Sequence, residues 1–197
     1  MMNEGVNEMS TDLSMLFENN GGPISPIQRK VDPWVGTLYE NYVFLNNNQK
    51  GSFGEEVVSA YFEKILGIRV NPRENAGHDC IIGNEKVEIK FSLAQQLPNN
   101  GNATKHNQFM LNHVSVGKDW DRLVFFGINM NNENVHFWFT KEDFTNRYRE
   151  LELFSAQQGG DKLDNDDWMC SKIARTPRSR SRYFLVDQDW VYPMESW

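Results

Sequence analysis

The sequence has 197 residues, of which 39% are hydrophobic and 13% aromatic, as expected for a folded domain rather than a disordered chain. A net charge of −7 argues against a protein that coats nucleic acid through bulk positive charge. No apolar run approaches the ~20 residues of a membrane-spanning helix. The two cysteines are far apart, which argues against a disulfide framework or a zinc site. Together with a polar N-terminal stretch, these features predict a cytoplasmic protein without a membrane partner.

The chain is expected to begin with a polar, asparagine-rich arm over residues 1–31, which would be mobile or would wrap around a partner. Residues 32–197 are expected to form one domain. Its first helix is predicted over residues 33–45, because Asp32-Pro33 has the pattern of an N-cap followed by proline, and apolar side chains then recur at helical spacing.

A second helix is predicted over residues 52–66, where apolar side chains recur with a period of 3.6 residues. Ser52 and Glu55 have the spacing of a capping box, and Gly67 supplies a C-terminal stop.

The pattern then changes to short strands separated by turns, including a hairpin turn at Gly83-Asn84. Charged residues at helical spacing predict a further helix over residues 141–154. This order of elements predicts an α/β fold with a mixed central β-sheet flanked by helices. The expected strands cover residues 68–70, 79–82, 86–93, 121–128, 135–139 and 183–186.

Three charged residues are expected to meet on one side of this sheet. Two-residue alternation places Glu88 and Lys90 on the same face of a strand, while Val87 and Ile89 point to the other face. The hairpin brings Asp79 beside them. A bound divalent metal would explain why two carboxylates and an ammonium lie together. Carboxylates are hard oxygen ligands, which suit Mg²⁺, with Mn²⁺ as a substitute.

The stretch His78-Asp79…Glu88-Ile89-Lys90 resembles the PD-(D/E)xK motif of restriction-endonuclease-like nucleases, with His78 where that family often has proline. In that family a preceding helix commonly adds an acidic residue after a glycine, and Gly54-Glu55 matches this pattern. The resemblance therefore implies a restriction-endonuclease-like core in which Asp79, Glu88 and Glu55 bind metal and Lys90 acts beside the attacking water. The alternative, in which Glu55 serves only as a helix cap, stays open.

The resemblance implies a metal-dependent endodeoxyribonuclease that acts on double-stranded DNA, most like a small type II restriction endonuclease working as a homodimer. The alternatives are a structure-selective repair or junction nuclease, a homing or phage nuclease, and an inactive DNA-binding module.

Two further segments are candidate DNA contacts. One carries five basic residues without an acidic residue, a local charge cluster suited to phosphates. The other carries amide side chains, which can bond to base edges. These candidates are Lys172, Arg175, Arg178, Arg180 and Arg182 in the basic segment, and Asn107 and Gln108 in the amide segment.

Overall fold

The structure is a computed structural model of the whole chain. The sequence predictions for the arm at residues 1–31, and for Asn107, Gln108, Arg178 and Arg180, fall outside the residues that it describes. The described residues are 32, 34–94, 109–129, 134–149, 153–157, 166–175 and 181–197.

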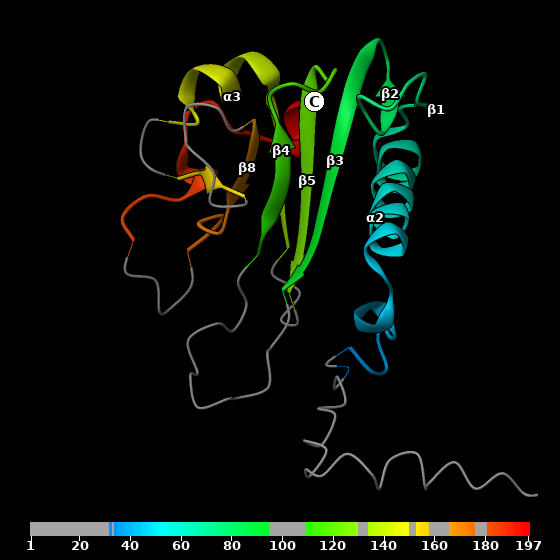
Figure 1. The fold of residues 1–197 in the computed structure, drawn as a ribbon. Helices are drawn as coiled ribbons and strands as arrows, with labels where there is room; N and C mark the ends of the chain where they lie inside the picture. The colour runs from blue at the N-terminus through cyan, green and yellow to red at the C-terminus, as the bar shows by residue number, and fades with distance from the viewer. Residues whose placement is uncertain are drawn as a thin grey trace, which may run out of the picture. The chain divides into compact units, whose positions relative to one another are not determined.

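A six-stranded mixed sheet forms the centre of the fold, in the order β1-β2-β3-β5-β6-β9 (Figure 1). The two long central strands, β3 and β5, run parallel, and every other neighbouring pair is antiparallel. The predicted mixed sheet is therefore confirmed. The strands are β1 (Val70–Pro72), β2 (Cys80–Ile82), β3 (Glu85–Ala94), β5 (Arg122–Asn129), β6 (Val135–Thr140) and β9 (Tyr192–Pro193).

The helix α2, Asn47–Tyr61, begins five residues before the predicted start and continues into a π-helical turn, η2, Phe62–Leu66. Its capping box is formed by Asn46 and Gln49, whose side chains each accept a hydrogen bond from the other residue's backbone N–H at 3.0 Å. The prediction of a capping box at Ser52 and Glu55 was therefore wrong. As a consequence, Glu55 lies in the third turn of the helix, where it has no capping role.

Helix α2 covers one face of the sheet, beside β3 (Figure 1). Val58 and Phe62 are fully buried there, in an apolar cluster that also contains Val87 and Ile89 of β3. A glycine permits the close approach: a Cβ on Gly54 would lie 2.4 Å from the Cβ of Phe91. This contact brings Glu55, the next residue of the helix, to the level of the sheet.

The opposite face is covered by a second, three-stranded sheet in the order β4-β8-β7, together with α3 (Lys141–Arg147). The predicted flanking helices are therefore present, but on this face α3 is accompanied by a second sheet. Aromatic side chains such as Trp120, Phe139 and Trp168 fill the layer between the two sheets. The small strands are β4 (Leu111–Ser115), β7 (Ser155–Ala156) and β8 (Asp167–Cys170).

Two predicted elements are absent from the described residues. The predicted helix at 33–45 is replaced by turns and a short 3-10 helix, η1, Tyr42–Phe44. Gly36 and Asn41 adopt left-handed backbone angles there, and the Asp32 carboxylate accepts hydrogen bonds from the backbone of Trp34 and Asn41.

The predicted strand at 183–186 overlaps instead with a 3-10 helix, η3, Leu185–Asp187, and a second short one, η4, Met194–Ser196, ends the chain. Helix α3 is also shorter than predicted. Within the described residues, every helix is too short or too polar to cross a bilayer.

Candidate active site

A groove of about 520 Å³ runs along the edge of β3, with α2 on one side and β4 on the other. The groove exists because β2 is short: β2 pairs with β3 only from Glu85 to Val87. Beyond Val87, the described residues supply no further strand on that side of β3. Glu55, Asp79, Glu88 and Lys90 all line this groove, so the structure brings together the four residues predicted from the sequence.

Asp79 lies where β2 and β3 separate. Its backbone N–H donates to the carbonyl of Val87 at 2.9 Å, as the last backbone bond between the two strands. Its carboxylate then accepts the next N–H of β3, from Ile89, at 2.7 Å. A side chain thus takes over where the backbone ladder stops, and this fixes the Asp79 carboxylate at the floor of the groove.

Glu88 is the most buried acid of the site, at 1% exposure. Its Oε1 atom accepts hydrogen bonds from two ammonium groups, Lys90 Nζ at 2.7 Å and Lys118 Nζ at 2.9 Å. Its Oε2 atom is equally buried, but no donor of the described residues reaches it. Burying a carboxylate oxygen without a hydrogen-bond donor destabilises the folded protein. A positively charged ligand at Oε2 would offset this cost.

Burial and the charge of a neighbouring carboxylate raise the pKa values of two acids of the site, Asp79 and Glu55. The pKa of Asp79 is raised, first by burial and then by the charge of Glu88, despite the opposing effects of the Ile89 N–H and of the two lysines. The pKa of Glu55 is also raised, by burial and then by the charge of Asp79. Since a divalent cation would stabilise all of these charges, the cluster has the electrostatics of a cation-binding site.

Sequence reasoning missed Lys118, which enters the site from the loop between β4 and β5. It lies 30 residues beyond Glu88, so no local spacing connects the two. Burial lowers the pKa of Lys118, but the hydrogen bond to Glu88 and the nearby charges of Glu88 and Asp79 outweigh this effect and raise it. Lys118 is therefore a charged ammonium within the site.

The loop that carries Lys118 is tied to the segment that carries Asp79. His78 is 1% exposed, and its Nδ1 lies 3.2 Å from the carbonyl oxygen of Asp119. Gly77 allows this approach, since a Cβ there would lie 2.7 Å from the Cβ of Asp119. His78 thus joins the two loops of the site.

The oxygen donors suit a hard divalent cation such as Mg²⁺ or Mn²⁺. Asp79 offers a carboxylate at the groove floor, and Glu88 offers Oε2, which has no other partner in the described residues. Among those residues, no three His, Cys, Asp or Glu side chains stand close enough together to form a ready-made metal cluster. The fit therefore rests on Asp79 and Glu88, with Glu55 at the groove wall.

The predicted DNA contacts that the structure describes lie outside this groove. Lys172, Arg175 and Arg182 do not line it. The guanidinium of Arg175 lies 5.0 Å from the ring centre of Phe184, and Arg182 is exposed. Their role in DNA binding stays a prediction. The groove itself contains Lys50, Lys90 and Lys118.

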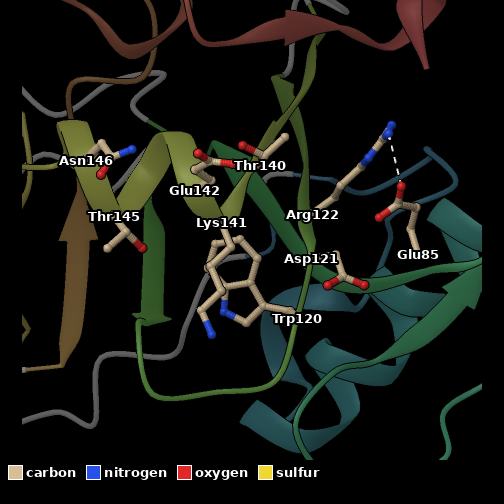
Figure 2. Close-up of a pocket in the computed structure, with 9 residues that line it drawn as sticks. All are labelled: Glu85, Trp120, Asp121, Arg122, Thr140, Lys141, Glu142, Thr145 and Asn146. Carbon is tan, nitrogen blue, oxygen red and sulfur yellow. Dashed lines mark hydrogen bonds and ion pairs between the residues drawn. The ribbon is translucent and has the colours of Figure 1, made fainter.

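A second pocket lies beside the start of α3, and two of its charged residues form an ion pair (Figure 2). Arg122 contacts Glu85 at 3.2 Å and lies over the rings of Trp138 and Trp197. The Asp121 carboxylate accepts the backbone N–H of Lys86 at 2.8 Å. These contacts join β3 to β5 and give the second pocket a structural role.

No protein-family model matches the sequence, and no curated protein matches it. Among solved structures, a bacterial homing endonuclease is similar over 70% of this chain and 84% of its own, with 13% identity and a TM-score of 0.41. A likeness at this level assigns neither a fold family nor an activity, so the functional conclusion rests on the geometry of the groove.

Proposed function

We propose that this protein is a metal-dependent endodeoxyribonuclease that hydrolyses phosphodiester bonds in the groove along β3. One observation carries the proposal, and it concerns the buried carboxylate of Glu88. One of its oxygens accepts hydrogen bonds from two lysines, and the other has no donor among the described residues. Asp79 supplies a second carboxylate close by. Carboxylates and ammonium groups at one spot suit a cation and a phosphate together.

Asp79 and Glu88 would hold the cation, and Glu55 would bind it directly or through water. When bound, Mg²⁺ would polarise the phosphodiester and lower the pKa of a water molecule. Lys90 is 2.7 Å from Glu88 and is 18% exposed, so its ammonium is fixed at the groove floor. From there it would orient the attacking water and stabilise the charge that develops on the phosphate oxygens.

The groove favours a polyanionic substrate. The protein is acidic overall, yet three lysines, Lys50, Lys90 and Lys118, line this one feature. Because phosphate contacts supply most of the affinity for DNA, a local concentration of ammonium groups matters more than the net charge. A homodimer with two such sites could cut both strands of a duplex, as palindromic recognition would require.

The proposal is tested by incubating the purified protein with plasmid and genomic DNA in Mg²⁺ or EDTA, beside Asp79→Ala and Lys90→Ala. We expect cleavage that requires Mg²⁺ and is lost in both variants. Absence of cleavage by a folded wild-type protein on any DNA, branched substrates included, would overturn the proposal.

The fragment pattern then separates the biological settings. Many discrete genomic fragments with symmetric ends indicate a type II restriction endonuclease. Cutting at very few long sites indicates a homing or phage nuclease. Selective cutting of branched or nicked DNA indicates a repair or junction nuclease.

A further inference from the structure

We propose that Lys118 is a second catalytic cation, which contacts the scissile phosphate directly, while Lys90 acts at the groove floor. The inference rests on the proposed function and deepens it, because it divides the work of the site between two lysines from different parts of the chain. The sequence motif contains only the first of them.

The first argument is one of charge. Glu88 carries a single negative charge, but two ammonium groups lie within 2.9 Å of its Oε1 atom. The charge of Asp79 also acts on Lys118, so two carboxylates hold the ammonium groups here. A divalent cation bound by Asp79 and Glu88 would compensate these carboxylates, and the Lys118 ammonium would then be available to an anionic phosphate.

The second argument is one of access. The Lys118 side chain is 40% exposed, whereas that of Lys90 is 18% exposed. Lys118 comes from the loop after β4, and Glu55 comes from α2, so the two residues approach the groove from opposite walls. A phosphodiester lying along the groove would meet Lys118 first, without displacing Lys90 from the floor.

The third argument is one of positioning, because the loop that carries Lys118 is held at two places. The carbonyl oxygen of Lys118 accepts a hydrogen bond from the Lys141 ammonium, which lies over the ring of Trp120 (Figure 2). The indole N–H of Trp120 in turn donates to the carbonyl of Ser115 at 2.8 Å, which closes the loop. A lysine with a fixed base can stabilise developing charge at little cost in reorganisation.

The test compares Lys118→Met and Lys118→Arg with Lys64→Met, a matched loss of one exposed lysine outside the groove. Two quantities are measured on a duplex that the wild-type protein cuts: the single-turnover cleavage rate in Mg²⁺, and the salt dependence of DNA binding in EDTA. Thermal melting checks that each variant is folded, and Lys118→Arg keeps the test informative if Lys118→Met does not fold.

For Lys118→Met, we expect cleavage slower by roughly 10²-fold, the effect of losing one charge-stabilising donor. The slope of log affinity against log salt should fall in magnitude by about one, because one phosphate contact is lost. Lys118→Arg should restore the slope and part of the rate. Lys64→Met should match wild type in both.

An unchanged rate and slope in Lys118→Met would overturn the inference and leave the proposed function standing. A slower rate with an unchanged slope would also overturn it, because Lys118 would then serve only to position Glu88. A wild-type protein that neither binds nor cuts DNA would instead remove the proposed function and the inference together.

Discussion

Strand β3 carries two clusters of charged residues that differ in how their charges are satisfied. At its start, Glu85 pairs with Arg122, and Lys86 pairs with Asp119 at 2.8 Å. The hydrogen bond from Lys86 lowers the pKa of Asp119, so the charged form of this acid is stabilised. Only a few residues further along, Glu88 keeps a buried oxygen without a donor in the described part of the chain.

The same side-chain types therefore serve two purposes on one strand. In the first cluster the acids are paired with basic residues of the protein, and the pKa of Asp119 is lowered. In the second cluster the carboxylates of Asp79 and Glu55 have raised pKa values, so the protein alone leaves them unfavourably charged. Charges that a fold leaves unbalanced in a groove mark the place where a ligand supplies the missing charge.

The largest expected effect separates two glutamates of the same strand. Glu88→Gln should lower the rate of DNA cleavage by about a thousandfold, because loss of a metal ligand removes several kcal/mol of transition-state stabilisation. Glu85→Gln, in the paired cluster, should cut at the wild-type rate. Equal rates for the two variants would break the distinction between the clusters.

The next effect concerns how α2 brings Glu55 to the groove. Gly54→Ala places a Cβ 2.4 Å from Phe91, so the helix must shift, and we expect a loss of about 1–3 kcal/mol in the free energy of unfolding. Gly51→Ala in the same helix meets no atom within 4 Å and should gain about 0.5–1 kcal/mol. Urea unfolding measures both, and equal changes would refute the close contact.

Metal binding should stabilise the folded protein through the second cluster and not through the first. Mg²⁺ or Mn²⁺ should raise the Tm of the wild-type protein. The free energy of unfolding should increase by about 2.7 kcal/mol when the free metal concentration is a hundredfold above its Kd. Asp79→Asn can still accept the Ile89 N–H but loses the charge, so its Tm should not respond. A metal-induced shift in Asp79→Asn equal to that of wild type would place the metal elsewhere.

The pH dependence of stability should carry the same signature. Because the pKa of Asp79 is raised in the folded protein, the folded state holds this proton more tightly than the unfolded chain does. The resulting stabilisation is present below the ordinary pKa of an aspartate and is lost as the pH rises through the raised value.

In EDTA, wild type should therefore lose stability relative to Asp79→Asn as the pH rises through this window. The measurement is urea unfolding of both proteins from acidic to neutral pH. A constant difference in stability across the window would contradict the raised pKa.

The smallest effect is expected in the paired cluster. Lys86→Met and Asp119→Asn remove an exposed ion pair, which contributes little to stability in water. Both variants should melt close to wild type, and Asp119→Asn should retain metal-dependent cleavage. A large loss of cleavage in Asp119→Asn would show that the two clusters are coupled through the loop that carries Lys118.

Local spacing was enough to predict the floor of the groove. The hairpin at Gly83 and the two-residue alternation placed Asp79, Glu88 and Lys90 together, because each of these relations spans only a few residues of one β-hairpin. The mixed sheet followed from the apolar patterns of its long strands.

The rest depends on contacts that no local pattern contains. Lys118 reaches Glu88 from 30 residues away, across a loop held by the side chains of His78 and Lys141. The second sheet consists of short strands, β4, β7 and β8, too brief to show a period. The start of α2 was placed wrongly because Ser52 and Glu55 have the spacing of a capping box, while Asn46 and Gln49 form the actual one.

The most direct test of the central claim begins with DNA bound to the protein in EDTA. Excess Mg²⁺ is then added to wild type and to Asp79→Asn, and cleavage of the bound DNA is followed in a single turnover. We predict that both proteins hold DNA before the addition and that only wild type cuts it afterwards. Cleavage by wild type before Mg²⁺ is added, or equal cleavage by Asp79→Asn, would contradict a metal-dependent site at Asp79 and Glu88.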